Sequence, residues 1–207
     1  MISFLMRENL AHDLRLLLVT DDAALEGRDV VAVCRAAVSG GVTAVQLRLK
    51  RASDRDLCAL ARELVQGLPV PVFVNDRLDV ALAAGAAGVH LGPDDLAPAL
   101  ARRITPPGFV IGASVGSEAE IARGALADYW GIGPLRHSPT KPDAGDALEW
   151  RGAAGWLARG GGRPCVVIGG VVPADVPLAL EAGFAGVAVV SGILGADDPR
   201  AAAARYR

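Results

Sequence analysis

The stretch AAGAAGVHL, residues 83–91, ends a helical pattern on a glycine and turns at once into an apolar run. The same phrase occurs twice more, as SGGVTAVQL (39–47) and EAGFAGVAV (181–189). In each case a glycine supplies the backbone freedom that a helix end requires, and the run that follows has the largely apolar character of a buried parallel strand. Each of the three segments is therefore predicted to form a tight turn that leads from a helix into a strand.

Apolar runs of this kind recur at roughly the spacing of one strand–helix unit, about 30 residues or somewhat less. The eight runs are residues 14–20, 43–49, 70–75, 87–91, 109–114, 128–133, 164–170 and 185–191. Between them lie segments with helical periodicity, and Ser53 is the predicted N-cap of one of these helices. This alternation predicts a single (β/α)8 TIM barrel over residues 1–207, with residues 1–13 as an extension before the first strand. An open doubly wound sheet is the alternative that the same alternation allows.

Composition limits the classes of function. The chain of 207 residues has a formal net charge of −2 and 52% hydrophobic residues, so no overall basic field points to nucleic acid or an anionic membrane. No uninterrupted apolar stretch is long enough to span a bilayer. The three cysteines are scattered without the spacing of a metal or disulfide motif, as expected for buried thiols in a reducing compartment. We therefore expect a cytoplasmic protein.

The active site of a (β/α)8 barrel lies at the carboxyl ends of its strands, so polar residues there are candidates. Gln46, Arg48 and Lys50 alternate along the second run and are predicted to point to the same side. Two inward cations need an anion, and Arg48 with Lys50 could hold a di- or triphosphate. The alternative is that Lys50 lies in a solvated loop past the strand, with Arg48 paired to Asp76.

Asp76 and Asp95 follow neighbouring strands. Two carboxylates close together repel each other unless a cation lies between them, and Mg²⁺ accepts one or two carboxylates together with water and phosphate oxygens. The alternative for each aspartate, and for the adjacent Asp94, is an ordinary helix cap. His90 lies inside an apolar run and is interpreted as a core histidine whose ring nitrogens are hydrogen-bonded.

Small residues follow the last two strands, in IGG (168–170) and VVSG (189–192). Backbone N–H groups in such loops can approach a phosphate closely, and the loops after strands seven and eight form the recurrent phosphate site of this barrel. The sequence therefore predicts a second anion site, separate from Arg48 and Lys50.

Seven motifs together resemble thiamine-phosphate synthase, also called thiamine-phosphate pyrophosphorylase. They lie in the expected order and span most of the chain, from LLVTD (17–21) to residue 193. The motifs are QLRLK (46–50), VNDRLDVALAAGAAGVHLGPDDL (74–96), IGAS (111–114), ADYWGIGP (127–134), SPTKPDAG (138–145), VVIGGV (166–171) and GVAVVSGI (186–193).

The resemblance implies a transferase that couples hydroxymethylpyrimidine pyrophosphate with a thiazole phosphate, giving thiamine phosphate and pyrophosphate by Mg²⁺-assisted, dissociative loss of pyrophosphate. It implies that Gln46 and Ser114 contact the pyrimidine and that Asp76 and Asp95 bind Mg²⁺. It assigns the pyrophosphate to Arg48, Lys50, Asn75 and Lys141. It assigns the thiazole phosphate to Ser138, Thr140, Gly170, Val190 and Ser191. The residues expected to act in catalysis are Arg48, Lys50, Ser114 and Lys141. Apart from the resemblance, the small size of the barrel is compatible with a homodimer.

The chain departs from the family's pattern at Arg136 and His137, where an aromatic or apolar residue followed by proline is usual. A related branch, the thiazole tautomerases, is expected to carry a catalytic histidine about where this chain has Gly116, and tends to lose the metal acids and the loop lysine. Asp76, Asp95 and Lys141 are all present here. The alternatives to the synthase are therefore a tautomerase-like isomerase or a non-catalytic regulator that binds thiazole phosphate on the same barrel.

Overall fold

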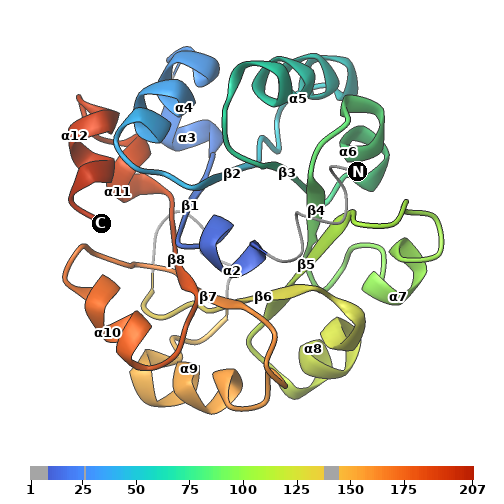
Figure 1. Cartoon of the computed structure of the whole chain (residues 1–207), viewed down its shortest axis with the longest axis vertical. Coiled ribbons are helices and arrows are strands. Elements are labelled where there is room, and N and C mark those ends of the chain that lie inside the picture. Colours follow the sequence, from blue (N-terminus) through green and yellow to red (C-terminus); the bar gives the residue numbers. More distant parts are fainter. Residues whose placement is uncertain (1–8, 26, 138–144) are drawn as a thin grey trace.

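A computed structural model describes residues 9–25, 27–137 and 145–207 of the chain. Its strands are all parallel and close into a barrel in chain order, with β1 pairing to β8 (Figure 1). The prediction of a (β/α)8 barrel is confirmed, and the open-sheet alternative is wrong. Each strand lies within or next to its predicted apolar run. The strands are β1 (Leu16–Val19), β2 (Ala44–Leu47), β3 (Val72–Asn75), β4 (Gly88–Leu91), β5 (Val110–Val115), β6 (Tyr129–Ile132), β7 (Cys165–Ile168) and β8 (Gly186–Val189).

Helices form a ring around the barrel (Figure 1). A further short helix, α2 (Leu10–Asp13), precedes β1 and lies over the middle of the ring in this view. Leu10 and Leu14 are buried together with residues of the barrel interior, so this segment closes the amino-terminal end of the barrel. The outer helices are α3 (Asp22–Leu25), α4 (Val30–Ser39), α5 (Asp54–Gly67), α6 (Leu78–Ala84), α7 (Pro98–Ala101), α8 (Glu118–Arg123), η1 (Gly124–Leu126), α9 (Glu149–Leu157), α10 (Asp175–Glu181), α11 (Ser191–Leu194) and α12 (Pro199–Ala204).

Alternation along the strands divides the apolar residues between two cores. In β1, Leu17 and Val19 face the barrel interior, whereas Leu16 and Leu18 pack against the surrounding helices. Aromatic side chains fill the interior at its centre, where the Phe73 and Tyr129 rings lie 5.8 Å apart between centroids. Small residues beside the two rings, such as Ala44, Gly112 and Ala188, leave room for them.

Local sequence signals explain several helix ends. The Ser53 side chain accepts a hydrogen bond from the Asp56 N–H at the start of α5, which confirms the predicted N-cap. Gly85 and Gly183 adopt the left-handed conformation, with φ of 70° and 97°, after α6 and α10. These are the glycines of two of the three repeated phrases, so the turn that they signal is confirmed.

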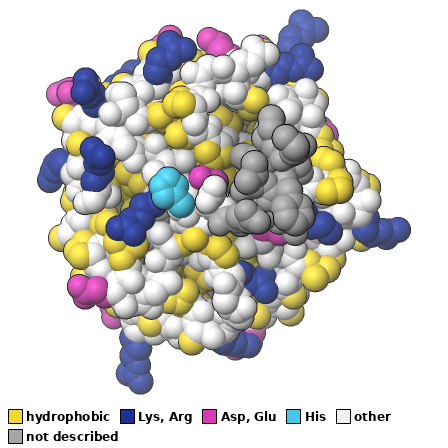
Figure 2. Space-filling model, viewed as in Figure 1, with side chains coloured by type: hydrophobic (Ala, Val, Ile, Leu, Met, Phe, Trp, Pro, Cys, Tyr) yellow, Lys and Arg dark blue, Asp and Glu magenta, His cyan; other side chains and the backbone are white. Residues whose placement is uncertain are grey.

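Surface charge is dispersed on the face drawn in Figure 2. Lys and Arg side chains project around the edge of the molecule instead of gathering into one patch. No helix in the described ranges is both long enough and apolar enough to cross a membrane.

Candidate functional site

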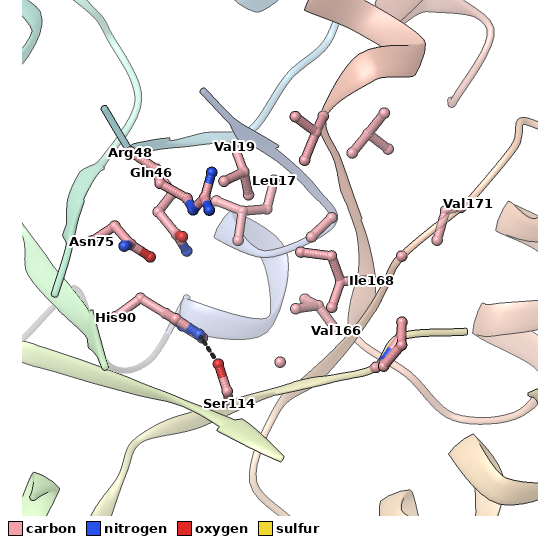
Figure 3. Close-up of a pocket in the computed structure, with 18 of the residues that line it drawn as sticks. Leu17, Val19, Gln46, Arg48, Asn75, His90, Ser114, Val166, Ile168 and Val171 are labelled. Atoms are coloured by element: carbon pink, nitrogen blue, oxygen red, sulfur yellow. Dashed lines mark hydrogen bonds between the residues drawn. The ribbon is translucent and has the colours of Figure 1, made fainter. Parts of the chain in front are cut away.

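A cavity of about 320 Å³ opens at the carboxyl ends of the strands. Polar side chains from β2 to β5 and the segments after them line one side, and aliphatic side chains from β1 and β7 line the other (Figure 3). The polar residues of the first side include Gln46, Arg48, Asn75, His90 and Ser114, and the aliphatic ones of the other include Leu17, Val19, Val166 and Ile168; Glu120 and Ser191 also line the cavity. Of the predicted site residues, Gln46, Arg48, Asn75, Ser114, Gly170, Val190 and Ser191 all line this cavity.

Arg48 is held by the end of β1. Its backbone N–H donates to Thr20 Oγ1 at 2.8 Å, and its guanidinium donates to Asp21 Oδ2 at 2.7 Å. The side chains of Arg48 and Asp21 are only 15% and 11% exposed, so solvent screens this ion pair weakly. The carboxylate partner of Arg48 is therefore Asp21, and the alternative that paired Arg48 with Asp76 is wrong.

Lys50 lies beyond the strand. Because β2 ends at Leu47, the strand alternation that placed Lys50 on the same side as Gln46 does not extend to it. Lys50 is exposed, and its backbone N–H donates to Asp22 Oδ2 at 2.7 Å. Lys50 does not line the cavity, but its charge opposes the rise in the pKa of Asp76, so its ammonium group is within electrostatic range of that carboxyl group.

Asp76 and Asp95 come together at the ends of β3 and β4. Burial, and then the neighbouring Asp95 carboxyl group, raise the pKa of Asp76 to about 7, against the opposing charges of Lys50 and Arg48. Asp76 has a left-handed backbone with φ of 63°, which is unusual for a residue other than glycine. A bound cation would reduce the repulsion between the ionised carboxylates of Asp76 and Asp95, which Lys50 and Arg48 offset only in part.

Neither aspartate acts as a helix cap. Helix α6 begins at Leu78, its N-cap is Arg77, and no side chain caps it by a hydrogen bond. Asp95 Oδ2 accepts a hydrogen bond from the Gly92 N–H at 2.6 Å within the loop after β4, whereas the adjacent Asp94 is exposed. The next helix, α7, has Ala97 as its N-cap and likewise no side-chain cap, so the capping alternatives are wrong for Asp76 and Asp95.

His90 links the barrel core to the site. Its Nδ1 lies 3.0 Å from the Tyr129 hydroxyl and its Nε2 lies 3.1 Å from Ser114 Oγ. His90 is 8% exposed, so the interpretation as a hydrogen-bonded core histidine is confirmed. Because its Nε2 partner lines the cavity, His90 also fixes the orientation of the Ser114 hydroxyl.

The turn after β7 forms the opposite wall. Gly169 and Gly170 both have left-handed backbones, with φ of 94° and 64°. A side chain at Gly169 would lie 2.7 Å from Pro134, so only glycine fits there. Among the described residues, the N–H groups of Gly169, Gly170 and Val171 donate to no protein acceptor. Free amides that line a cavity are the feature expected of an anion site.

Residues after β8 adjoin the same wall. Val190, Ser191 and Gly192 line the cavity, and a side chain at Gly192 would lie 2.2 Å from the Tyr206 hydroxyl. That hydroxyl also donates to the Val171 carbonyl at 3.3 Å, so Tyr206 packs beneath both loops. Ser138, Thr140 and Lys141 lie outside the described residues, and their predicted roles stay predictions.

The residues that support the cavity-lining side chains and loops, which are Asp21, Tyr129 and Tyr206, were not predicted from the sequence. Asp21 could have been found, because it directly follows the first apolar run at the carboxyl end of a predicted strand. Tyr129 and Tyr206 gave no such signal, because an aromatic residue in a strand or near a helix end is ordinary core material.

The fold and the cavity define a (β/α)8-barrel protein whose candidate site lies at the carboxyl ends of the strands, with Arg48 on one side and, on the other, backbone amides that have no acceptor in the described part of the chain. The family described as thiamine monophosphate synthase matches residues 16–193. The chain belongs to this family.

Relatives and solved structures agree with this assignment. Thiamine-phosphate synthase of Xanthobacter autotrophicus is 48% identical over 92% of both chains. That of Albidiferax ferrireducens is 43% identical over 96% of this chain and 94% of the relative. The structure of thiamine phosphate pyrophosphorylase from Pyrococcus furiosus has a TM-score of 0.83 at 33% identity and covers 96% of both chains. A 3-hexulose-6-phosphate synthase, with a TM-score of 0.67 at 20% identity over 93% of this chain and 97% of that one, shares the fold.

Proposed function

We propose that this chain is a transferase that couples hydroxymethylpyrimidine pyrophosphate with thiazole phosphate, releasing pyrophosphate and giving thiamine phosphate. One observation carries the proposal: a single cavity has Arg48 and neutral polar side chains on one side and, on the other, aliphatic side chains and a turn whose backbone amides have no acceptor among the described residues. The two substrates match this arrangement, because each has a ring and one anionic group, and the rings can meet in the middle of the cavity while the anionic groups point to opposite sides. Family membership supports the same reaction.

The polar side suits the pyrimidine substrate. Arg48 presents a planar fork with one N–H already given to Asp21, which leaves the remaining donors for pyrophosphate oxygens. Gln46 and Ser114 line the adjoining surface and can hydrogen-bond the ring, and Asn75 adds an amide donor. Lys50 and, by resemblance, Lys141 add point charges that stabilise the leaving pyrophosphate.

The amide wall suits the thiazole phosphate. The N–H groups of the turn after β7 have no acceptor among the described residues, and with the residues after β8 they provide donors without adding formal charge. Loss of pyrophosphate from an electron-rich pyrimidinylmethyl carbon leaves a resonance-stabilised cation, which the thiazole nitrogen can capture without a strong general base. The contribution of the protein is then orientation of the two substrates and stabilisation of the leaving group.

The residues present fit Mg²⁺. No group of three or more His, Cys, Asp or Glu side chains gathers as a metal cage within the described ranges, but Asp76 and Asp95 supply two hard oxygen ligands. Mg²⁺ typically takes only one or two carboxylates and completes its shell with water and substrate phosphates. When bound, it would neutralise charge on the departing pyrophosphate. We propose Asp76 and Asp95 as the residues that hold it.

The test is to mix the two phosphorylated substrates with the purified protein and MgCl₂ and to follow thiamine phosphate by chromatography. We expect thiamine phosphate and pyrophosphate in equal amounts, and a loss of two or more orders of magnitude in rate for Arg48→Ala. Absence of thiamine phosphate from the wild-type reaction would refute the proposal. Isomerisation of a thiazole carboxylate phosphate in its place would identify a tautomerase.

A further inference from the structure

Arg136 makes an unusual set of contacts with the turn after β7. Its backbone N–H donates to the Gly169 carbonyl at 3.0 Å, and its Nη1 donates to the Gly170 carbonyl at 3.1 Å. One residue therefore holds two successive carbonyl groups of the glycine turn. Arg136 itself does not line the cavity, so any effect on a ligand must pass through these peptide groups.

Asp175 fixes the guanidinium from the other side. The pair is bidentate, with Nη1 to Oδ2 at 2.7 Å and Nη2 to Oδ1 at 2.8 Å. Asp175 Oδ2 also accepts the Val172 N–H at 2.8 Å, and its side chain is only 3% exposed. Burial opposes ionisation, but Arg136 and the Val172 N–H more than offset it and hold the pKa of Asp175 below its usual value. The fork of Arg136 thus has one fixed orientation.

The contacts of Arg136 with the Gly169 and Gly170 carbonyl groups determine which way the following N–H groups point. In a planar trans peptide the C=O and the following N–H point in opposite directions. With the Gly169 and Gly170 carbonyls turned toward Arg136, the N–H groups of Gly170 and Val171 are turned away from it. Both residues line the cavity, and neither N–H donates to another group in the part of the chain that the structure describes.

We propose that Arg136 is a positioning residue that sets the glycine turn so that the Gly170 and Val171 amides face a substrate phosphate group. The inference rests on the proposed function, which identifies that group as the phosphate of the thiazole substrate. It also gives a role to the position at which this chain departs from the family's pattern. In place of an aromatic or apolar residue, the loop after β6 supplies an arginine whose guanidinium group holds the loop after β7.

A positioning role predicts a change confined to one substrate. In Arg136→Lys an ammonium group still neutralises Asp175, but it cannot bond both Asp175 oxygens and the Gly170 carbonyl in one plane. We expect KM for thiazole phosphate to rise about tenfold, about 1.4 kcal/mol, while KM for the pyrimidine pyrophosphate stays within about twofold. A purely structural ion pair would lower the thermal midpoint and leave the ratio of the two KM values unchanged.

The matched control is Arg159→Lys. Arg159 also pairs with a carboxylate, Glu118, and its side chain is 45% exposed against 44% for Arg136, but it lies on the outer surface. We expect neither KM to change in this variant. A second variant, Asp175→Asn, keeps an acceptor for the Val172 N–H while weakening its hold on the guanidinium, and should shift KM for thiazole phosphate in the same direction as Arg136→Lys.

Binding of inorganic phosphate separates this inference from the proposed function. Calorimetric titration in an Arg48→Ala background reports on the amide wall, because the main cation of the other side is absent. We expect Arg136→Lys to weaken phosphate binding about tenfold in that background. Unchanged phosphate affinity, or equal rises in both KM values, would overturn the inference. Failure of the wild-type protein to make thiamine phosphate would refute the proposed function alone.

Discussion

The ionised Asp76 side chain should lower the free energy of unfolding above neutral pH, and Asp76→Asn should restore it. A carboxyl group whose pKa rises from 3.8 to about 7 disfavours its ionised form by up to about 4 kcal/mol, at about 1.4 kcal/mol per pH unit. The side chain is only half-buried, so solvent screening reduces this, and we expect an effect of about 2 kcal/mol. For a chain of this length that corresponds to about 4–8 °C in the thermal midpoint.

The pH dependence has a definite sign. Between about pH 4 and pH 7 the folded state holds a proton on Asp76 that the unfolded chain has released, so stability falls as pH rises through this window. At pH 5 the wild-type side chain is largely protonated, and Asp76→Asn should be close to wild type apart from a constant offset. At pH 8 the penalty is fully developed, and the asparagine variant should be the more stable. Asparagine also tolerates the left-handed backbone at this position.

The assay is thermal unfolding followed by circular dichroism from pH 5 to pH 8.5, for wild type and Asp76→Asn, with and without MgCl₂. Mg²⁺ should raise the midpoint of the wild-type protein more than that of the variant, because only the wild type offers both carboxylates. Coupling activity should fall in the variant even as its stability rises. A stability difference that stays constant from pH 5 to pH 8 would refute the reasoning.

Two further predictions concern Asp21 and the barrel core. In Asp21→Asn the side-chain oxygen can still cap α3, but the new amide group places N–H donors against the Arg48 guanidinium. We therefore expect kcat/KM to fall about tenfold or more. The control is Asp29→Asn, which changes the equivalent cap of α4 and should leave kcat/KM unchanged. In Gly112→Ala the new Cβ would lie 2.2 Å from the fully buried Tyr129 ring, and overpacking should lower the free energy of unfolding by about 1–3 kcal/mol in urea denaturation; wild-type stability would contradict this.

The barrel could be predicted because its signals are local. Each strand is a short apolar run, and the turns into β4 and β8 are announced by glycines that the structure places in the left-handed conformation. Gln46, Arg48, Asn75 and Ser114 could be named as candidates because the fold assigns function to one end of every strand. Once the fold was assigned, these candidates followed from their positions at the strand ends.

The partners of those residues could not be predicted, because they depend on register and loop path. Arg48 meets Asp21 across 27 residues and Arg136 meets Asp175 across 39, and no periodicity relates the members of either pair. The left-handed backbone of Asp76 is likewise set by tertiary contacts, since its N–H donates to the His90 carbonyl on the next strand. Sequence alone indicated which groups could carry charge but not which charges neutralise each other.

Closure of the barrel in chain order has a further consequence for how such a protein can change. Gln46, Arg48, Asn75 and Ser114, which line the polar side, belong to one arc of the barrel, and Arg136, the glycine turn after β7 and the residues after β8 belong to another. Mutations that retune recognition of one substrate therefore fall in a different part of the gene from those that retune the other. The two specificities can drift or be selected separately, and a chimaera that exchanges one arc between relatives should exchange one preference at a time.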